Sequence, residues 1–317
     1  MTALYARLRD LPQNLRGALW MLLSAFAFSL MDASIKLVGQ GLDSFQIAFF
    51  RSLFGGLAIL PFALRMGRTA FRTKRLGGHF GRAACGYMSM ALGFYGITHL
   101  PLADAVALSF TRPLFMIVLA VLILGEVVRW RRWSATIVGF MGVLIMARPG
   151  ASGFDPAMAA SMTGAMFAAG VGVLIKRLAT TERPETIIIY FTAISSLLAL
   201  GPALYVWRTP TPAEFAILLV IGALGSLGQY FSIRSYRIAE ATAVEPIDYS
   251  RLVFATALGF AIFAELPDLW TLVGAFIIVA STLYIARREA RLRREAESAH
   301  AAGQPGTAPP KAAQPLE

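Results

Sequence analysis

Six charged side chains interrupt the apolar stretches of this sequence away from their ends. They are Asp32, Arg51, Arg112, Glu245, Asp248 and Arg251. A charge at the middle of an apolar helix costs roughly 2.5 kcal/mol or more in lipid, so it persists where it faces a polar interior or an opposite charge. Three acids and three bases can pair with one another, or bind a charged organic solute.

Two segments that carry these arginines repeat each other. Residues 101–126 and 240–265 align without a gap at an offset of 139, with identical residues at Arg112/Arg251, Phe115/Phe254, Leu119/Leu258, Ile123/Ile262 and Glu126/Glu265. At 3.6 residues per turn, these identities fall within an arc of roughly 80° on one helix face. The spacing predicts a duplicated helix whose central arginine faces a polar cavity.

The rest of the chain consists mainly of further apolar helices. Of 317 residues 57% are hydrophobic and 15% are charged, which indicates a membrane protein that crosses the bilayer several times. Stretches of about 20 apolar residues can cross a bilayer. Ten such stretches predict an all-α fold with spans near residues 17–38, 44–65, 80–99, 102–124, 133–148, 158–177, 185–206, 213–234, 241–264 and 269–286.

Basic residues indicate the orientation of these helices. The 29 Lys and Arg residues give a net charge of +11, and they concentrate in alternate loops, beginning with the N-terminal segment. Basic loops stay on the cytoplasmic side, so both termini are expected there. The charge therefore sets topology in the lipid bilayer, and binding to nucleic acid is not expected.

The ten helices divide into two halves of five. We expect a cytoplasmic N-terminal segment at 1–16, a first repeat at 17–149, a connecting loop at 150–157, a second repeat at 158–286 and a basic, then disordered, cytoplasmic tail at 287–317. An odd number of spans in each half inserts the second half upside down. Such inverted repeats are typical of secondary transporters.

Charge pairs follow from depth along the helices. Asp32 and Arg51 lie at similar distances from the outer helix ends, which predicts an ion pair that either locks the structure or takes part in binding. Asp248 is three residues from Arg251 and can pair with it on one helix face. Arg112 has no acid at such a spacing, so it binds either a substrate carboxylate or phosphate or an acid of the other repeat.

Other residues at similar depth could line the same cavity. The aromatic and amide candidates for substrate binding are Tyr95, Tyr249, Gln229 and Tyr230. Aromatic rings can stack on a flat or cationic ligand, although helix packing is an alternative role for each tyrosine. Asp248 and Glu245 are the candidates for proton coupling, with counter-substrate exchange as the alternative. The sequence indicates no oligomeric state.

Catalytic and metal-binding patterns are not found in the sequence. Cys85 is the single cysteine, and the three histidines have no metal-ligand spacing. No Walker sequence or Ser/His/Asp set occurs, so no cofactor, metal or enzymatic activity is expected. A membrane-embedded enzyme and a channel remain the alternatives from other functional classes.

Several motifs resemble a known family over most of the chain. They are the run 101–105, the segment 111–115, Gly125-Glu126, Trp133 and 139–142 in the first half, and 248–252 with Ala264-Glu265 in the second. These motifs resemble the EamA type of the drug/metabolite transporter superfamily, whose members are ten-helix carriers. The segments 42–51 and 132–149 look similar to S-adenosylmethionine carriers within it.

This resemblance implies a secondary transporter of the inner membrane. Its substrate would be a small zwitterionic or anionic metabolite, such as S-adenosylmethionine or an amino acid, moved by alternating access. Riboflavin carriers and drug or amino-acid exporters of the same type look similar too, and they remain the alternatives.

Overall fold

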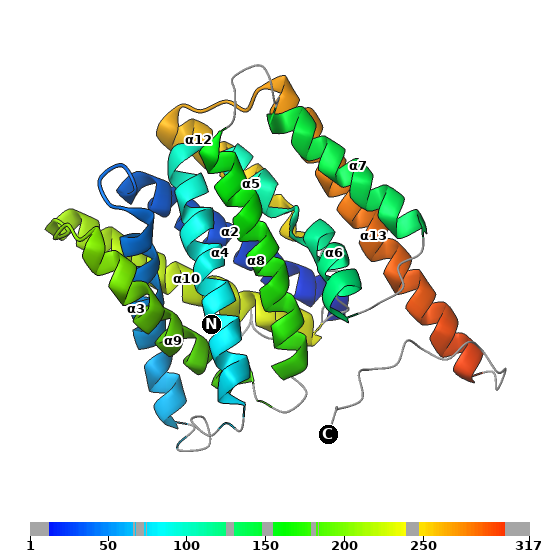
Figure 1. The fold of residues 1–317 in the computed structure, drawn as a ribbon, viewed down its shortest axis with the longest axis horizontal. Coiled ribbons are helices and arrows are strands. Elements are labelled where there is room, and N and C mark those ends of the chain that lie inside the picture. The colour runs from blue at the N-terminus through cyan, green and yellow to red at the C-terminus, as the bar shows by residue number, and fades with distance from the viewer. Residues whose placement is uncertain are drawn as a thin grey trace, which may run out of the picture.

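The computed structural model describes residues 13–65, 67, 73, 75–124, 130–147, 155–178, 182, 184–238 and 247–301. Within these residues the protein is all-helical, with no strand. The helices, shown in Figure 1, are α2 (Gln13–Val38), α3 (Ser44–Arg65), α4 (Leu76–His99), α5 (Leu102–Ser109), α6 (Arg112–Leu124), α7 (Trp130–Ala147), α8 (Pro156–Leu178), α9 (Pro184–Tyr205), α10 (Pro212–Ile238), α12 (Ser250–Phe263) and α13 (Leu269–Ala301).

These helices account for the ten expected membrane segments, with α5 and α6 as two halves of the fourth. Six segments are long and apolar enough to span a bilayer: α2, α3, α5 with α6, α8, α9 and α10. Shorter apolar helices lie in α7, α12 and α13. The remaining helix, α4, contains more polar residues because it packs against protein, between α2, α3, α8 and α9.

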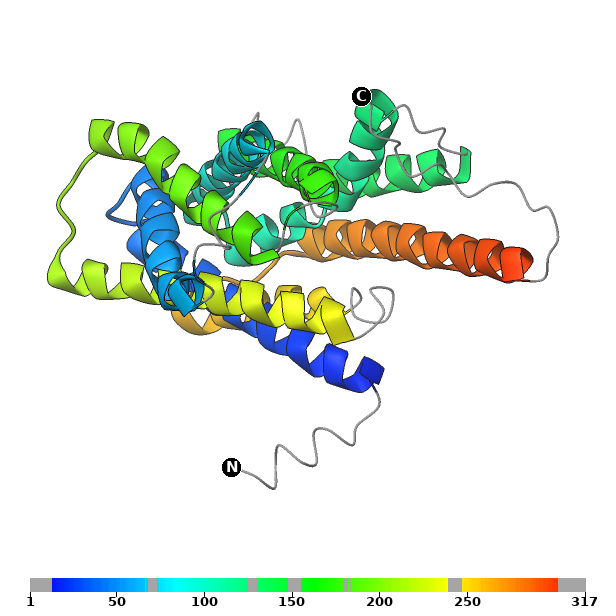
Figure 2. The ribbon, with the colours of Figure 1, turned by 90° about the horizontal axis from the view of Figure 1, so that it is seen from below.

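A helix of one half and the helix at the same place in the other half are called counterparts here. When two helices from different halves pack together, their counterparts also pack together. Helix α2 packs against α10, and its counterpart α8 packs against α4; likewise α2 packs against α12 while α8 packs against α6. Counterparts also pack against each other, as α3 does with α9 and α7 with α13. Figures 1 and 2 show α7 and α13 side by side along one flank of the molecule. This pairing is that of a duplicated unit related by an approximate two-fold axis.

The expected helix at 102–124 is interrupted just before Arg112. Helix α5 ends at Ser109 and α6 begins at Arg112, with turns at Phe110 and Thr111. Pro113 lies in the first turn of α6, where its missing N–H leaves no helical hydrogen bond unmade. The Thr111 hydroxyl donates to the Leu108 carbonyl at 2.6 Å and satisfies one acceptor at the end of α5. A break, rather than a bend, therefore accompanies this arginine.

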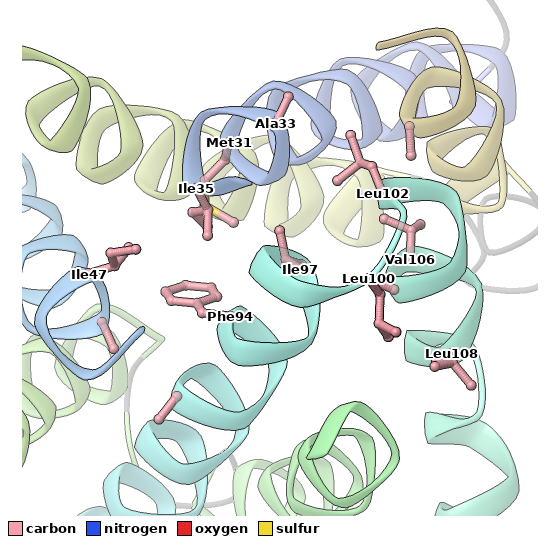
Figure 3. Packing of buried hydrophobic residues seen from close by; sticks show 14 of the residues in the cluster. Met31, Ala33, Ile35, Ile47, Phe94, Ile97, Leu100, Leu102, Val106 and Leu108 are labelled. Carbon is pink, nitrogen blue, oxygen red and sulfur yellow. The ribbon is translucent and has the colours of Figure 1, made fainter. Parts of the chain in front are cut away.

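A continuous apolar core joins the first helices. Figure 3 shows Met31 and Ile35 of α2, Ile47 of α3, and Phe94 and Ile97 of α4 facing one another. All five are buried, with at most 7% of their surface exposed. The core therefore fixes the C-terminal half of α2 against the C-terminal half of α4.

The last helix is longer than its expected span at 269–286. Helix α13 continues to Ala301 and runs past the end of α7 (Figures 1 and 2). Its extension carries Arg287 and Arg291, which are both exposed.

Candidate functional site

The broken helices place the two repeated arginines at equivalent positions. Arg112 begins α6, and Arg251 is the second residue of α12. The residues two positions earlier, Phe110 and Tyr249, contact each other with ring centroids 4.8 Å apart. Equivalent residues contact one another only near the axis that relates the repeats, so the two arginines flank that axis.

Arg251 is neutralised by Asp32 of α2. The Arg251 Nη2 and Nε atoms donate to Asp32 Oδ2 at 2.5 and 3.1 Å. The Asp32 side chain is 1% exposed and that of Arg251 is 20% exposed. The Arg251 guanidinium also lies over the Phe28 ring, 5.3 Å from its centroid. Both hydrogen bonds go to one carboxylate oxygen, and this charge-assisted pair between helices of different repeats limits the cost of burying both groups.

The predicted ion pair of Asp32 with Arg51 is wrong. Arg51 Nη1 instead donates to the Met90 sulfur at 3.2 Å, and its charge attracts Asp32 without a hydrogen bond between them. Depth along the helix did not identify the partner of Asp32. Arg251 takes that place because α12 packs directly against α2.

Asp248 is attracted electrostatically to both repeated arginines. It is half-buried, it precedes the turn at Tyr249, and its carboxylate attracts both Arg251 and Arg112. The expected pair of Asp248 with Arg251 is present only as this attraction, since the hydrogen bonds of Arg251 go to Asp32. Asp248 can therefore accept hydrogen bonds from a cationic group.

Arg112 is the least compensated of these charges. Its side chain is exposed, although it stands at the middle of an apolar segment. Among the described residues, no acid lies within ion-pair distance of it. Gly172 of α8 lies beside this part of α6: a Cβ atom there would clash with Met116 Cε and lie 3.5 Å from Arg112 Nη2, so the glycine makes room for the Met116 side chain next to Arg112.

The other predicted site residues are placed differently. Tyr249 is next to the arginines through its contact with Phe110. Tyr95 stacks on His99, with centroids 4.0 Å apart, near the end of α4. Tyr230 is 43% exposed and accepts a hydrogen bond from Arg234 Nε at 2.9 Å, away from the repeated arginines.

The remaining predicted site residues are Gln229 and Glu245. Gln229 is half-buried on α10. Glu245 lies outside the described residues.

Sequence reasoning missed a contact that joins the two repeats at the helix ends. Lys36 forms an ion pair with Glu265 and donates to the Leu100 carbonyl at 2.5 Å. The other Glu265 oxygen accepts the Leu102 N–H at 2.9 Å. The signal available was that Lys36 and Glu265 are both charges at the same predicted membrane face.

A second missed group lies at the start of α4. His79 and Arg82 are 1% and 5% exposed. His79 stacks on Tyr190 with centroids 4.6 Å apart, and the Arg82 guanidinium lies 4.2 Å from the Phe191 ring centroid. Their spacing of three residues places them on one helix face, but sequence reasoning assigned Arg82 only to topology.

Comparison with known proteins agrees with this architecture. The model of the EamA-like transporter family matches twice, over residues 15–148 and 156–287. A solved crystal structure with 18% identity has the same fold, with a TM-score of 0.57 over 84% of this chain and 98% of its own.

Curated relatives extend over nearly the same region. The S-adenosylmethionine uptake transporter of Rickettsia prowazekii (strain Madrid E) is 35% identical over 275 residues, which are 87% of this chain and 94% of the relative. The riboflavin transporter of Rhizobium johnstonii (strain DSM 114642 / LMG 32736 / 3841) is 33% identical over 88% of this chain and 93% of its own. The pseudopaline exporter of Pseudomonas aeruginosa (strain UCBPP-PA14) is 31% identical over 86% of this chain and 96% of its own.

Both repeats of the family model are present, and the relatives are covered almost completely. The two family matches, the extent of the curated relatives and the apolar helices of the described residues agree with a multi-pass membrane transporter. This chain belongs to the EamA-like transporter family.

Proposed function

We propose that this transporter moves a small metabolite with an amino-acid group across the bacterial inner membrane by alternating access. S-adenosylmethionine is the first candidate, and both termini lie in the cytoplasm. One observation carries the proposal: Arg112 is exposed beside a helix break, whereas its repeat counterpart Arg251 is neutralised by Asp32. A repeated arginine left without an acid among the described residues suits a substrate carboxylate.

The neighbouring groups complement the rest of an amino-acid group. Asp248 attracts Arg112 without hydrogen-bonding to it, so a substrate ammonium can lie against the Asp248 carboxylate while the substrate carboxylate binds Arg112. The rings of Phe110 and Tyr249 lie two residues from the repeated arginines and offer a surface for a sulfonium or a flat base. Asp32 and Arg251 then hold the two repeats together rather than contacting the substrate.

The named activities of the relatives narrow the candidates without deciding between them. S-adenosylmethionine carries a carboxylate, an ammonium and a sulfonium, and riboflavin carries no carboxylate. A site built around Arg112 and Asp248 therefore favours the former. Asp248 is also the described residue best placed for proton coupling, while exchange against a related metabolite would leave its charge unchanged during transport.

Counterflow tests this proposal. Proteoliposomes preloaded with unlabelled S-adenosylmethionine should transiently accumulate the labelled compound, and preloading with riboflavin should not support accumulation. Arg112→Gln should lower the transport efficiency about tenfold or more, because one charge-assisted bidentate contact is lost. Arg16→Gln, at the start of α2, is the control.

Two results would contradict the proposal. If riboflavin accumulates and S-adenosylmethionine does not, then riboflavin and not S-adenosylmethionine is the substrate. Normal transport by correctly inserted Arg112→Gln would remove the role of Arg112.

A further inference from the structure

Helix α4 carries a buried polar stripe that the central site does not use. His79, Arg82 and Tyr87 lie on the side of the helix that faces α9 and the core, and they are 1%, 5% and 6% exposed. Among the described residues, both His79 ring nitrogens, Arg82 Nε and the Tyr87 hydroxyl have no hydrogen-bond partner. His79 Nε2 lies 4.0 Å from the Glu182 carboxylate, which leaves Arg82 Nε and the Tyr87 hydroxyl without a polar partner among the described residues. Buried polar atoms are nearly always paired, so these two atoms call for a ligand or another partner.

Arg82 is held in place, yet its charge is not matched. Its guanidinium lies 4.2 Å from the Phe191 ring centroid, and Nη1 donates to the Ile187 carbonyl at 3.5 Å, the limit of a hydrogen bond. Stacking on an aromatic face fixes the plane of a guanidinium and leaves its edge free to donate. No described carboxylate lies within ion-pair distance of Arg82.

A second buried arginine adds to the positive charge of this region. Arg51 is 8% exposed, donates to the Met90 sulfur, and lies near enough to Arg82 for the two charges to repel each other. Asp32 attracts Arg51, but both hydrogen bonds to its Oδ2 come from Arg251. The repulsion between two buried like charges makes this region favourable for an anion at Arg82.

The position of Arg82 separates this region from the repeated arginines. Arg82 lies six residues after the start of α4, about 9 Å along the helix at 1.5 Å per residue. In the proposed topology α4 begins at the cytoplasmic face, so Arg82 lies between that face and the centre of the membrane. Contacts between α4 and α9 also join the two repeats here, as in the pairing of His79 with Tyr190.

We propose that Arg82, supported by the charge of Arg51, binds the carboxylate of the transported metabolite on the cytoplasmic side of the central site. This second carboxylate-binding position at Arg82, called the station below, adds to the proposed function and rests on it. The planar edge of Arg82 matches a carboxylate bidentately, and an anion there compensates the repulsion between the two arginines. The substrate then passes its carboxylate between Arg112 and Arg82 as it crosses the protein.

Exchange measured separately from each face tests the station. Oriented proteoliposomes are given S-adenosylmethionine, or decarboxylated S-adenosylmethionine, on one face while the other face is saturated. Arg82→Gln should raise the half-saturating concentration of S-adenosylmethionine at the cytoplasmic face about tenfold or more. The half-saturating concentration of S-adenosylmethionine at the outer face should change less than twofold, and so should that of the decarboxylated compound at either face. Arg82→Lys should have an intermediate effect.

A matched control and three outcomes make the result decisive. Arg65→Gln removes an exposed arginine at the end of α3, on the same expected membrane face, and should leave both half-saturating concentrations unchanged. Equal losses for both compounds, or at both faces, would show that Arg82 only packs the helices, and would overturn the proposal. Dependence of both compounds on chloride, with gluconate as the replacement, would assign the station to an inorganic anion instead.

A separate binding measurement distinguishes failure of the station from failure of the substrate proposal. L-methionine should raise the melting temperature of purified wild-type protein, and 3-(methylthio)propylamine, which lacks the carboxylate, should not. Arg82→Gln should reduce the shift produced by L-methionine. If wild type fails to transport S-adenosylmethionine but this difference holds, the substrate proposal fails and the station stands. If L-methionine shifts both proteins equally, or shifts neither, the station is overturned.

Discussion

Phe110 and Tyr249, which occupy equivalent positions in the two repeats, contact each other with ring planes 55° apart. The helix breaks before Arg112 and Arg251 bring these rings together near the approximate two-fold axis. The contact therefore joins the two repeats at the level of the proposed substrate site.

The first prediction concerns this aromatic pair. Phe110→Leu and Tyr249→Leu should each destabilise the protein, and the double variant should lose about 0.5–1.5 kcal/mol less than the sum of the two, because the ring contact is shared. Thermal unfolding in detergent measures this coupling. Phe115→Leu, which alters a ring contact with Phe140 within one repeat, should not couple to Tyr249→Leu. Strict additivity of Phe110 and Tyr249 would argue against the contact.

The second prediction concerns the partner of Asp32. Replacing one member of a buried ion pair leaves the other uncompensated and costs about 3–5 kcal/mol. Asp32→Asn and Arg251→Gln should therefore be strongly non-additive in thermal unfolding, whereas Asp32→Asn and Arg51→Gln should be closer to additive. If Arg51 shows the larger coupling, the hydrogen-bonded pair assigned to Arg251 is incorrect.

The third prediction concerns the contact between Lys36 and Glu265. This ion pair joins the end of α2 to Glu265, two residues after the end of α12, so under alternating access it must break when the outer ends separate. Glu265→Gln should weaken it and raise the population of the outward-open state about tenfold, as expected for a loss of roughly 1.4 kcal/mol.

Cysteine labelling from outside measures that population. Ser29→Cys, in a Cys85→Ser background, introduces a thiol at a fully buried position next to Arg251. Its reaction with an impermeant maleimide should accelerate in Glu265→Gln. Glu214→Gln is the matched control, because both side chains of the Arg208–Glu214 pair belong to the second repeat, one from the loop after α9 and one from the first turn of α10. Equal labelling rates in the Ser29→Cys background protein, its Glu265→Gln variant and its Glu214→Gln variant would show that Glu265 has no gating role.

The fourth prediction concerns pH. Burial lowers the pKa of His79, which precedes the expected span at 80–99, and the Glu182 carboxylate, whose Oε2 lies 4.0 Å from Nε2, opposes part of that effect. Below the unfolded pKa of about 6.5, the unfolded state binds a proton that the folded state binds less readily, so stability falls as pH falls.

Melting temperatures between pH 8 and pH 5.5 measure this effect. Wild type should lose at most about 1.4 kcal/mol per pH unit through this group, and His79→Gln should show a shallower slope. Identical slopes for the two proteins would mean that His79 does not titrate differently on folding.

The sequence by itself determined where the apolar helices lie along the chain. Apolar length set the spans, and the repeat at offset 139 identified Arg112 and Arg251 as counterparts. These features are properties of the linear sequence, so they can be derived without knowing which segments pack together.

Only the tertiary structure decided which charges meet. Depth made Arg51 a reasonable partner for Asp32, but depth fixes one coordinate, and the lateral order of the helices depends on packing between distant segments. Because α12 packs against α2, Arg251 binds Asp32, while Arg51 and Arg82 remain without hydrogen-bonded carboxylates among the described residues. The same packing left Arg112 exposed, and the physical reason is that side-chain pairing follows three-dimensional contact and not position along the helix.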